Sequence, residues 1–424
     1  MFPLLLKIQK KTILKGFVAT FCFIPVITLV HAQENTQKLT LKNAILLTLE
    51  QNPELKSFVF QKKIYEGIVK QVSVSQRPQV ELTVEDMLGT GNYNGLSSAQ
   101  TTLSISWLLD QQQVEGRVAS AKSAIDQVGV ERETKALDLS AYTARLFIET
   151  LVNHDRLKVA NLGVEQAKQA IGIIQKRVNV GKNSEIDLFQ AQQELIEREL
   201  MVEGLHHDLG SALYKLSSMW GTPTDHGITL EGNLVQLPQI KNIAEQQQKL
   251  ISNPKFKLFA TKQRMAESEI ELARIESKPQ WQLTTGVRRY NATDDYGLVA
   301  GITVPWGENK ASAGKIHSLQ AKKAQLDSES SAFKNQLNAQ VYVLLKGMEH
   351  SQYVIKSLKT KTLPLLEKTI DQATKAYEIG QIGFQQWNTS QQKLLSAKYE
   401  LLSAYEKIHL QNIEIQRLTG ETLN

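Results

Sequence analysis

Four short segments of the chain alternate apolar and polar residues with a period of two. In the first segment, Val80, Leu82 and Val84 alternate with polar residues. This pattern predicts β-strands that have one apolar and one polar face. Each segment has about ten residues, the length of a tilted strand that crosses a membrane, although a soluble antiparallel sheet with one buried face would show the same alternation. The four segments are 79–88, 99–109, 280–290 and 297–306.

Most of the remaining chain has the heptad spacing of coiled-coil helices. The spacing stops at Gly181, resumes after it, and recurs on both sides of Gly380. It predicts long helical hairpins that turn near 181 and near 380, where a glycine can adopt the left-handed cap conformation. Ser184 and Asp187 have the spacing of a capping box that begins the first return helix. The apolar positions before the first turn are Leu157, Ala160, Val164, Ala167, Ile171, Ile174 and Val178.

The two halves of the mature chain are copies of one unit. Asn52-Pro53 recurs as Asn253-Pro254, a shift of 201 residues, whereas Gly181 and Gly380 differ by 199. One deletion of two residues, placed in the loop between the paired strands, explains both shifts, and loops tolerate such changes of length. We therefore divide the chain into repeat 1 (40–221), a linker (222–240) and repeat 2 (241–420).

The first 32 residues have the organisation of a secretory signal peptide. Four lysines precede the apolar run 16–30, and small residues stand at the positions that direct cleavage between Ala32 and Gln33. The run is shorter than the ~20 apolar residues of a membrane-spanning helix. The chain's one cysteine, Cys22, follows a large residue, so we expect no lipidation. The mature chain therefore has no disulfide and no cysteine ligand or nucleophile.

Charge and motif content argue against nucleic-acid binding and catalysis. Four of the 49 basic residues are in the leader, which leaves 45 against 43 acidic residues, so the mature chain is near neutral. The sequence has no basic stripe with interleaved aromatics, no phosphate-binding glycine loop and no nucleophile elbow. His206 and His207 point about 100° apart on a helix, unlike the pair that shares a metal. We therefore predict no enzyme activity and no catalytic, cofactor or metal site.

The strand pairs carry aromatic residues at both ends if each pair is a hairpin. Two aromatic girdles are the signature of a protein that crosses both membrane interfaces. Four strands cannot close a barrel, and open sheet edges are not tolerated in lipid, so we predict that the chain oligomerises. The helix-proximal aromatics are Trp107, Trp281 and Trp306, and those near the loops are Tyr93, Tyr290 and Tyr296.

From Leu39 to Gly420 the sequence resembles the TolC-type outer-membrane efflux family. The resemblance rests on several segments in combination: Asn52-Pro-Glu-Leu55, Pro78 before a strand, Ile302-Thr-Val-Pro305, Tyr377-x-x-Gly380 and Leu418-Thr-Gly420. It implies an α+β membrane protein that forms a homotrimer. Twelve pooled strands would form one β-barrel in the outer-membrane lipid, and the helices would form a periplasmic tunnel. The implied partners are a periplasmic adaptor protein and an inner-membrane efflux pump.

Within that family the chain is most similar to the outer-membrane components of heavy-metal cation efflux, of the cobalt, zinc and cadmium type. Gly286-Val-Arg-Arg-Tyr290 and Gly297 to Pro305 carry this likeness. The resemblance implies a passive conduit, since an upstream pump can choose the cargo. Two other ducts remain alternatives, one for multidrug efflux and one for type I protein secretion. A periplasmic coiled-coil structural or adaptor protein would share the leader and the heptads, but has no reason to carry four matched strands.

The resemblance places the two glycine turns at the periplasmic tip, where the pore constricts and an adaptor touches. Here the sequence departs from the family pattern, because Gln386 to Thr389 stands where many relatives carry acids that ring the pore. Asp187 is the acid at the equivalent position of repeat 1, and a helix-capping role is the simpler expectation for it. Tyr377 is either a packing residue of the seam or a hydrogen-bonding latch. The predicted tip residues are Gly181, Lys182, Asp187, Tyr377, Gly380, Gln381 and Gln386.

Overall fold

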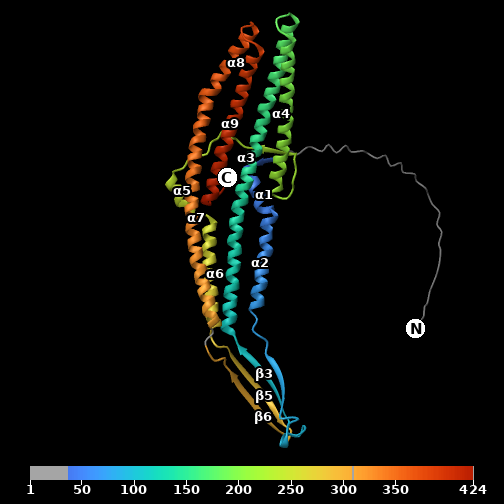
Figure 1. The fold of residues 1–424 in the computed structure, drawn as a ribbon, viewed down its shortest axis with the longest axis vertical. Helices are drawn as coiled ribbons and strands as arrows, with labels where there is room; N and C mark the ends of the chain where they lie inside the picture. Colours follow the sequence, from blue (N-terminus) through green and yellow to red (C-terminus); the bar gives the residue numbers. More distant parts are fainter. Residues whose placement is uncertain (1–36, 308–309, 424) are drawn as a thin grey trace, which may run out of the picture. The chain divides into compact units, whose positions relative to one another are not determined.

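The computed structural model describes residues 37–307 and 310–423 (Figure 1). The predicted cleavage site at Ala32 and Gln33 lies outside these residues. Long helices occupy most of the described chain, and a four-stranded sheet is connected to one end of them. No helix in this part of the chain combines the length and the apolar character needed to cross a membrane.

The helices and strands follow one another in the same order in the two halves, except that the long helix after the first strand pair is divided into two helices in the second half. The first half contains β1 (Gln37–Thr40), α1 (Leu41–Gln51), α2 (Pro53–Val72), β2 (Gln79–Glu85), β3 (Gln100–Leu109), α3 (Gln111–Asn179) and α4 (Glu185–Ser218). The second half contains β4 (Ile228–Glu231), α5 (Ile243–Lys249), α6 (Pro254–Glu276), β5 (Trp281–Tyr290), β6 (Asp295–Thr303), α7 (Lys310–Ser357), α8 (Leu363–Glu378) and α9 (Phe384–Thr419). The last predicted strand therefore begins two residues earlier and ends three residues earlier than expected.

The Asn-Pro pairs show why the two repeats fold alike. The side-chain oxygen of Asn52 accepts a hydrogen bond from the Glu54 amide, and Asn253 caps α6 in the same way, with proline in the first helical turn. Each asparagine also donates its amide to the end of the return helix, Asn52 to the Met219 carbonyl at 2.8 Å and Asn253 to the Leu418 carbonyl at 3.0 Å. One motif thus caps a helix and ties each repeat closed.

The four strands form one antiparallel sheet in the order β2-β3-β5-β6. β3 of repeat 1 pairs with β5 of repeat 2, so the sheet crosses the junction between the repeats, and β2 and β6 are its edges. Leu103 lies opposite both Leu82 and Val287, which places the apolar residues of the three strands on one face. The polar residues, including Arg288 opposite Thr102, share the other face.

Helices pack side by side in the same repeat order at two levels. Nearer the sheet, neighbours contact in the order α2-α3-α6-α7, and nearer the turns in the order α4-α3-α9-α8 (Figure 1). One core cluster joins α1, α3, the end of α4, α7 and α9, and includes Phe147, Leu345 and Ile408. A second, smaller cluster lies at the turns and contains Ile174, Tyr377 and Trp387.

Two features of the fold were not predicted. The linker contains β4, which pairs in parallel with β1, the first strand of the described chain. The helix that precedes the second turn is interrupted by a π-helical segment, Leu358–Thr362, directly before Pro364, whereas α3 runs through 69 residues without a break. Proline lacks the amide that would continue the hydrogen-bond ladder, and single π turns often mark places where a helix bends.

Candidate functional site

Both hairpin turns are built in the same way around a left-handed glycine. Gly181 has a φ of 69° and Gly380 a φ of 83°. Beyond each glycine, the amide of the next residue bonds back into the last helical turn, Lys182 to the Arg177 carbonyl and Gln381 to the Ala376 carbonyl, at 2.8 Å each. The side chains of Lys182 and Gln381 are exposed at the surface of the turns.

The predicted capping box is only half formed. Ser184 caps α4 by accepting a hydrogen bond from the Ile186 amide at 3.1 Å. The carboxylate of Asp187 does not return the bond to Ser184; it accepts one from the side-chain amide of Asn183 at 2.7 Å. Asp187 lies in the first turn of α4, where the helix dipole favours an anion. Its observed contacts are therefore local to this turn.

Side chains of repeat 1 bind repeat 2 directly at the turns. The Arg177 guanidinium donates to the Asn183 side chain at 2.6 Å and to the Glu378 carbonyl, and its charge lies 5.2 Å from the centre of the Tyr377 ring. The Asn183 amide in turn donates to the Tyr377 hydroxyl at 2.9 Å. We call these four residues, Arg177, Asn183, Tyr377 and Glu378, the tip clasp.

Tyr377 is both a packing residue and a hydrogen-bonding one. Its ring is buried and stacks on Trp387 at 4.6 Å between centroids, and the Trp387 indole donates to Thr374 at 3.0 Å. Burial, reinforced by the negative charge of Asp187, raises the pKa of the Tyr377 phenol above its usual value, so the hydroxyl stays protonated at neutral pH. Gln386, in the next helix, is exposed and takes no part in these contacts.

A second contact between the hairpins lies deeper and contains a buried ion pair. Arg198 of α4 donates to Glu194 at 2.8 Å, to the Gly163 carbonyl at 2.7 Å and to Asn388 of α9 at 3.3 Å. Glu194 also accepts hydrogen bonds from Asn388 and from Gln392, the latter at 3.0 Å. Only 8% of the Arg198 side chain and 16% of the Glu194 side chain are exposed. We call Glu194, Arg198, Asn388 and Gln392 the buried joint.

The buried joint keeps its carboxylate ionised. Burial alone would raise the pKa of Glu194, but the hydrogen bonds from Arg198, Asn388 and Gln392 outweigh it and hold that pKa below its usual range. Gly163 belongs to the same arrangement, because a Cβ at this position would lie 3.1 Å from the Leu395 side chain. The joint is thus fully paired, and the loss of one partner would leave a charge without compensation.

The joint also gives a structural role to a polar residue in the segment 386–389, after the second turn. The side chain of Asn388 is buried and binds both Arg198 and Glu194. In the sequence, Arg198 is a polar residue on the apolar seam that follows Gly181, at heptad spacing from Leu195 and Val202. This position could have predicted the buried joint, since a charge at a buried seam position requires a counter-charge beside it.

The sheet is inverted relative to a soluble one, because its apolar face is exposed. Leu298 is 90% exposed, and Val80, Leu82, Leu103 and Ile302 are also exposed, whereas Thr102 and Ser106 on the polar face are buried. In water such a face would be destabilising, since burying apolar area is the main driving force of folding. The arrangement fits a sheet whose apolar face contacts lipid and whose polar face lines a lumen.

The aromatic residues of the sheet lie at its two ends, but Tyr290 is on the polar face. Trp107 and Trp281 lie on the apolar face near the helices, and Trp306, which follows β6, is fully exposed. Tyr296 lies on the apolar face at the loop end, and Tyr93 is exposed in the β2–β3 loop. Tyr290 was predicted to join this girdle, but it pairs with Asp295 on the polar face. Its even position in β5 turns it away from Tyr296, so the register argues against a lipid contact.

The polar face carries a network that ties three strands together. Arg288 of β5 donates to Thr102 at 2.9 Å and Gln100 at 3.1 Å on β3, and to Glu85 on β2 at 2.9 Å. Gly286 permits the close approach of β3, because a Cβ there would lie 2.6 Å from the Leu103 carbonyl oxygen. This network fixes the register of the sheet across the repeat junction.

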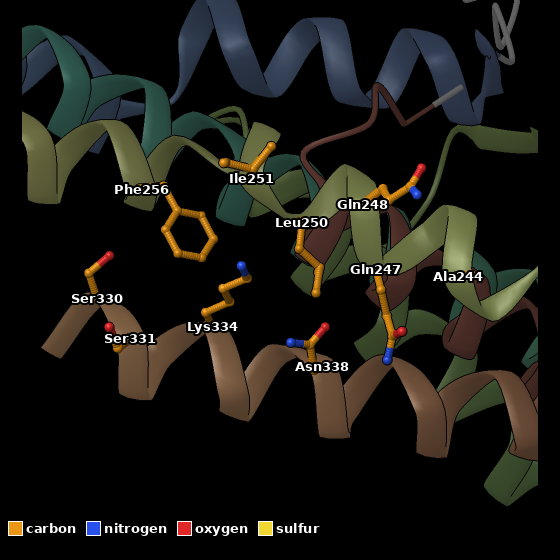
Figure 2. Close-up of a pocket in the computed structure, with 10 residues that line it drawn as sticks. All are labelled: Ala244, Gln247, Gln248, Leu250, Ile251, Phe256, Ser330, Ser331, Lys334 and Asn338. Carbon is orange, nitrogen blue, oxygen red and sulfur yellow. The ribbon is translucent and has the colours of Figure 1, made fainter. Parts of the chain in front are cut away.

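A groove of about 580 Å³ lies between α7 and the segment that runs from α5 to the start of α6. Leu250, Ile251 and Phe256 form one wall, and Lys334 and Asn338 of α7 form the other, as Figure 2 shows. Its lining contains no carboxylate or imidazole, so it has no preferred ligand for a metal cation. Within 37–307 and 310–423, no three acidic, histidine or cysteine side chains come close enough together to hold a metal ion.

Comparisons with known proteins agree with this architecture. Residues 44–222 match the family model described as outer membrane efflux protein. The chain is 23% identical over 393 residues to the cobalt-zinc-cadmium resistance protein CzcC of Cupriavidus metallidurans, and the alignment covers 92% of each chain.

Solved structures have the same fold. CusC superposes with a TM-score of 0.71 at 16% identity, covering 90% of this chain and 92% of CusC. VceC of Vibrio cholerae superposes with a TM-score of 0.70 at 13% identity, covering 91% of this chain and 97% of VceC. The matched family model spans repeat 1, and the curated relative and these structures extend the likeness to repeat 2. Repeat 1 therefore matches the outer membrane efflux protein family model, and the chain shares the fold of the solved channels over about nine-tenths of its length.

Proposed function

We propose that this protein is the outer-membrane duct of a tripartite efflux system for heavy-metal cations. It conducts passively, while an inner-membrane pump supplies the energy and a periplasmic adaptor joins the two. The observation that carries the proposal is the inverted sheet at one end of long helical hairpins. An exposed apolar face of strand length suits the hydrocarbon core of a bilayer, and helices of ~100 Å suit a periplasmic tunnel.

Three copies assemble into the working channel. The sheet of one chain ends in two open edges, β2 and β6, which lipid does not tolerate because their backbone groups lack partners. Pooling four strands from each of three chains makes a twelve-stranded barrel in which every edge is paired. Its polar face, with Arg288 and Glu85, then lines the lumen.

The tip is the gate and the adaptor contact. The tip clasp holds the two hairpins of one chain together at the turns, and exposed Lys182, Gln381 and Gln386 surround it. Because the clasp joins side chains and a backbone carbonyl without a buried carboxylate, water can replace its hydrogen bonds at modest cost. An adaptor that binds the turns more tightly when the hydrogen bonds of the tip clasp are broken would favour the open tip.

Heavy-metal cargo is supported by the likeness to CzcC over nearly the whole chain. A duct needs no metal-binding cluster of its own, because the pump upstream selects the cargo. Ions should pass faster through a lumen that does not bind them tightly, since tight coordination would slow their release.

The direct test of cargo is a growth assay. The gene is deleted, restored on a plasmid, and each strain is grown with zinc, cadmium, cobalt, nickel, copper or silver salts and with lipophilic drugs and detergents. Complemented sensitivity to metals alone is the expected result. Sensitivity to drugs with unchanged metal tolerance would overturn the cargo and leave the duct in place. Release of the protein from membranes by salt alone would instead favour a periplasmic protein.

A further inference from the structure

We propose that the groove between α7 and the segment from α5 to the start of α6 binds a glycan that carries a carboxylate. The inference rests on the proposed function only for its location, because the helices of an outer-membrane duct stand in the periplasm. That compartment contains a polymer of this chemistry, since the bacterial cell wall consists of sugar strands with acidic groups. A site of this kind would attach the duct to the wall without touching its cargo.

The equivalent place in repeat 1 is filled by apolar side chains. A shift of 201 residues equates Phe256 with Leu55, and the shift of 199 equates Asn338 with Leu139. Leu55 and Leu139 are buried in the core cluster where α1 packs on α3, whereas Phe256 and Asn338 are only half-buried. The two repeats share one fold, so the groove in repeat 2 comes from the side chains that repeat 2 has substituted.

The charges at this place differ between the repeats as well. In repeat 1, Lys135 forms an ion pair with Glu54. Lys334 is the equivalent of Lys135, but Lys255 stands at the position of Glu54. Two more acids of repeat 1 are replaced by uncharged residues of the groove, Glu50 by Ile251 and Glu131 by Ser330. Repeat 2 thus keeps the lysine and loses the acids around it, so the groove favours an anionic ligand.

The two walls of the groove differ in polarity as the face and the edge of a sugar ring do. Ile251 and Phe256 offer an apolar surface to the C–H face of a ring. On the opposite wall, Ser331 and Asn338 offer a hydroxyl and an amide, which can donate to and accept from sugar hydroxyl groups. Figure 2 shows Lys334 extending from α7 toward Phe256. A sugar that rests on the Phe256 ring therefore brings a carboxylate within reach of this ammonium group.

An amphipathic helix of a partner protein, carrying an acid, is the competing occupant. Such a helix inserts an apolar stripe and requires apolar side chains along both walls of its groove. The α7 wall consists of polar side chains: Ser330, Ser331, Lys334 and Asn338. The volume of about 580 Å³ is also that of a site for a small ligand, which here means a short stretch of sugar units. These features favour the glycan over the helix.

Calorimetric titration of the purified protein in detergent with a pair of disaccharides tests the site. N-acetylglucosaminyl-N-acetylmuramic acid carries a carboxylate, and N,N′-diacetylchitobiose has similar rings without it. We expect the acidic disaccharide to bind about tenfold more tightly, because only it gains a charged hydrogen bond from Lys334. Lys334→Met should abolish this preference. Lys135→Met, at the equivalent position of repeat 1, is the matched control and should keep it. Lys334 is exposed, so its substitution should leave the melting temperature unchanged.

Equal affinity for the two disaccharides, no binding of either, or the same loss in Lys135→Met as in Lys334→Met would overturn the glycan site. Binding of an acidic amphipathic peptide, without binding of the acidic disaccharide, would also overturn it and would assign the groove to a protein partner. Each of these results leaves the duct standing, because the duct does not depend on the groove. Release of the protein from membranes by salt alone would overturn the duct, whatever the result with the sugars.

Discussion

The two contacts between the hairpins of this chain differ in chemistry and depth. The tip clasp joins Arg177 to a backbone carbonyl and an amide at the surface, while the buried joint pairs Arg198 with a carboxylate that is itself held by three donors. Water can replace the first set of bonds, but opening the second would expose an ion pair and its packing. In the proposed gating, the tip would therefore open while the joint keeps the hairpins together.

The helices that lead to the two turns differ in whether they are continuous. α3 is uninterrupted, whereas the segment 358–362 before α8 is π-helical and is followed by Pro364. A break in the backbone ladder is a place where a helix bends at low cost. In the proposed gating, the second hairpin would therefore be the one that bends, with the first as its frame.

The largest expected effect comes from removing one charge of the buried joint. Glu194→Ala leaves the Arg198 guanidinium buried without its carboxylate, so the free energy of unfolding should fall by about 3–5 kcal/mol. Thermal unfolding of the purified protein measures this. The double variant Glu194→Leu with Arg198→Met is the matched control, because it removes both charges and should be much less destabilised. Equal losses in the two variants would show that packing, and not the ion pair, makes the joint.

Acidification should weaken the buried joint selectively. Because the pKa of Glu194 is lower when folded than when unfolded, its contribution to stability is present above its ordinary value of 4.5 and is lost as the pH falls below that value. Melting temperatures of wild type and Glu194→Gln, measured from neutral pH downward, should therefore converge as the solution becomes acidic. A gap that stays constant across this range would contradict the assignment of an ionised carboxylate.

Removal of Arg177 should have a moderate effect on stability. Arg177→Ala deletes the hydrogen bonds to Asn183 and Glu378 and the contact with the Tyr377 ring, at a cost of about 1–2 kcal/mol. Lys182→Ala, at the neighbouring exposed position, is the control and should leave the melting temperature unchanged. If Arg177→Ala lowered the free energy of unfolding as much as Glu194→Ala does, the tip clasp and the buried joint would be equally strong. That result would contradict the comparison.

The smallest effect is expected for Tyr377→Phe. The ring keeps its stacking on Trp387 and loses only the hydrogen bond to Asn183, so the free energy of unfolding should fall by about 1 kcal/mol. Because the pKa of Tyr377 is raised in the folded state, the wild type should become less stable as the pH rises above 10. Tyr377→Phe has no phenol to ionise, so it should not show this loss. If wild type and Tyr377→Phe depended on pH in the same way above pH 10, the raised pKa of Tyr377 would be contradicted.

Local patterns predicted much of the architecture, because strands and coiled coils are specified by spacing within a few turns. The alternation around Leu82 and the heptads before Gly181 found the strands and the hairpins, and subtraction of residue numbers found the repeat. The predicted tip residues Asp187 and Tyr377 do come together through Asn183. Asn183 itself was missed because a lone asparagine in a turn carries no distinctive pattern.

Other features depended on partners far apart in the chain. Arg198 and Asn388 are separated by 190 residues, and no periodicity links them. The face of Tyr290 depended on where β5 ends and the hairpin loop begins, which spacing locates only to within a residue or two. The pairing of β4 with β1 joins two four-residue strands, each too short for alternation to identify.

The most direct test of the central claim is the conductance of the purified protein in a planar lipid bilayer. If the chain forms a duct that the tip clasp closes, wild type should insert with a small conductance, and Arg177→Ala with Asn183→Ala should increase it several-fold. Lys182→Ala should match wild type. A protein that does not insert, or a clasp variant with wild-type conductance, would contradict the account of a membrane-spanning conduit closed at its tip.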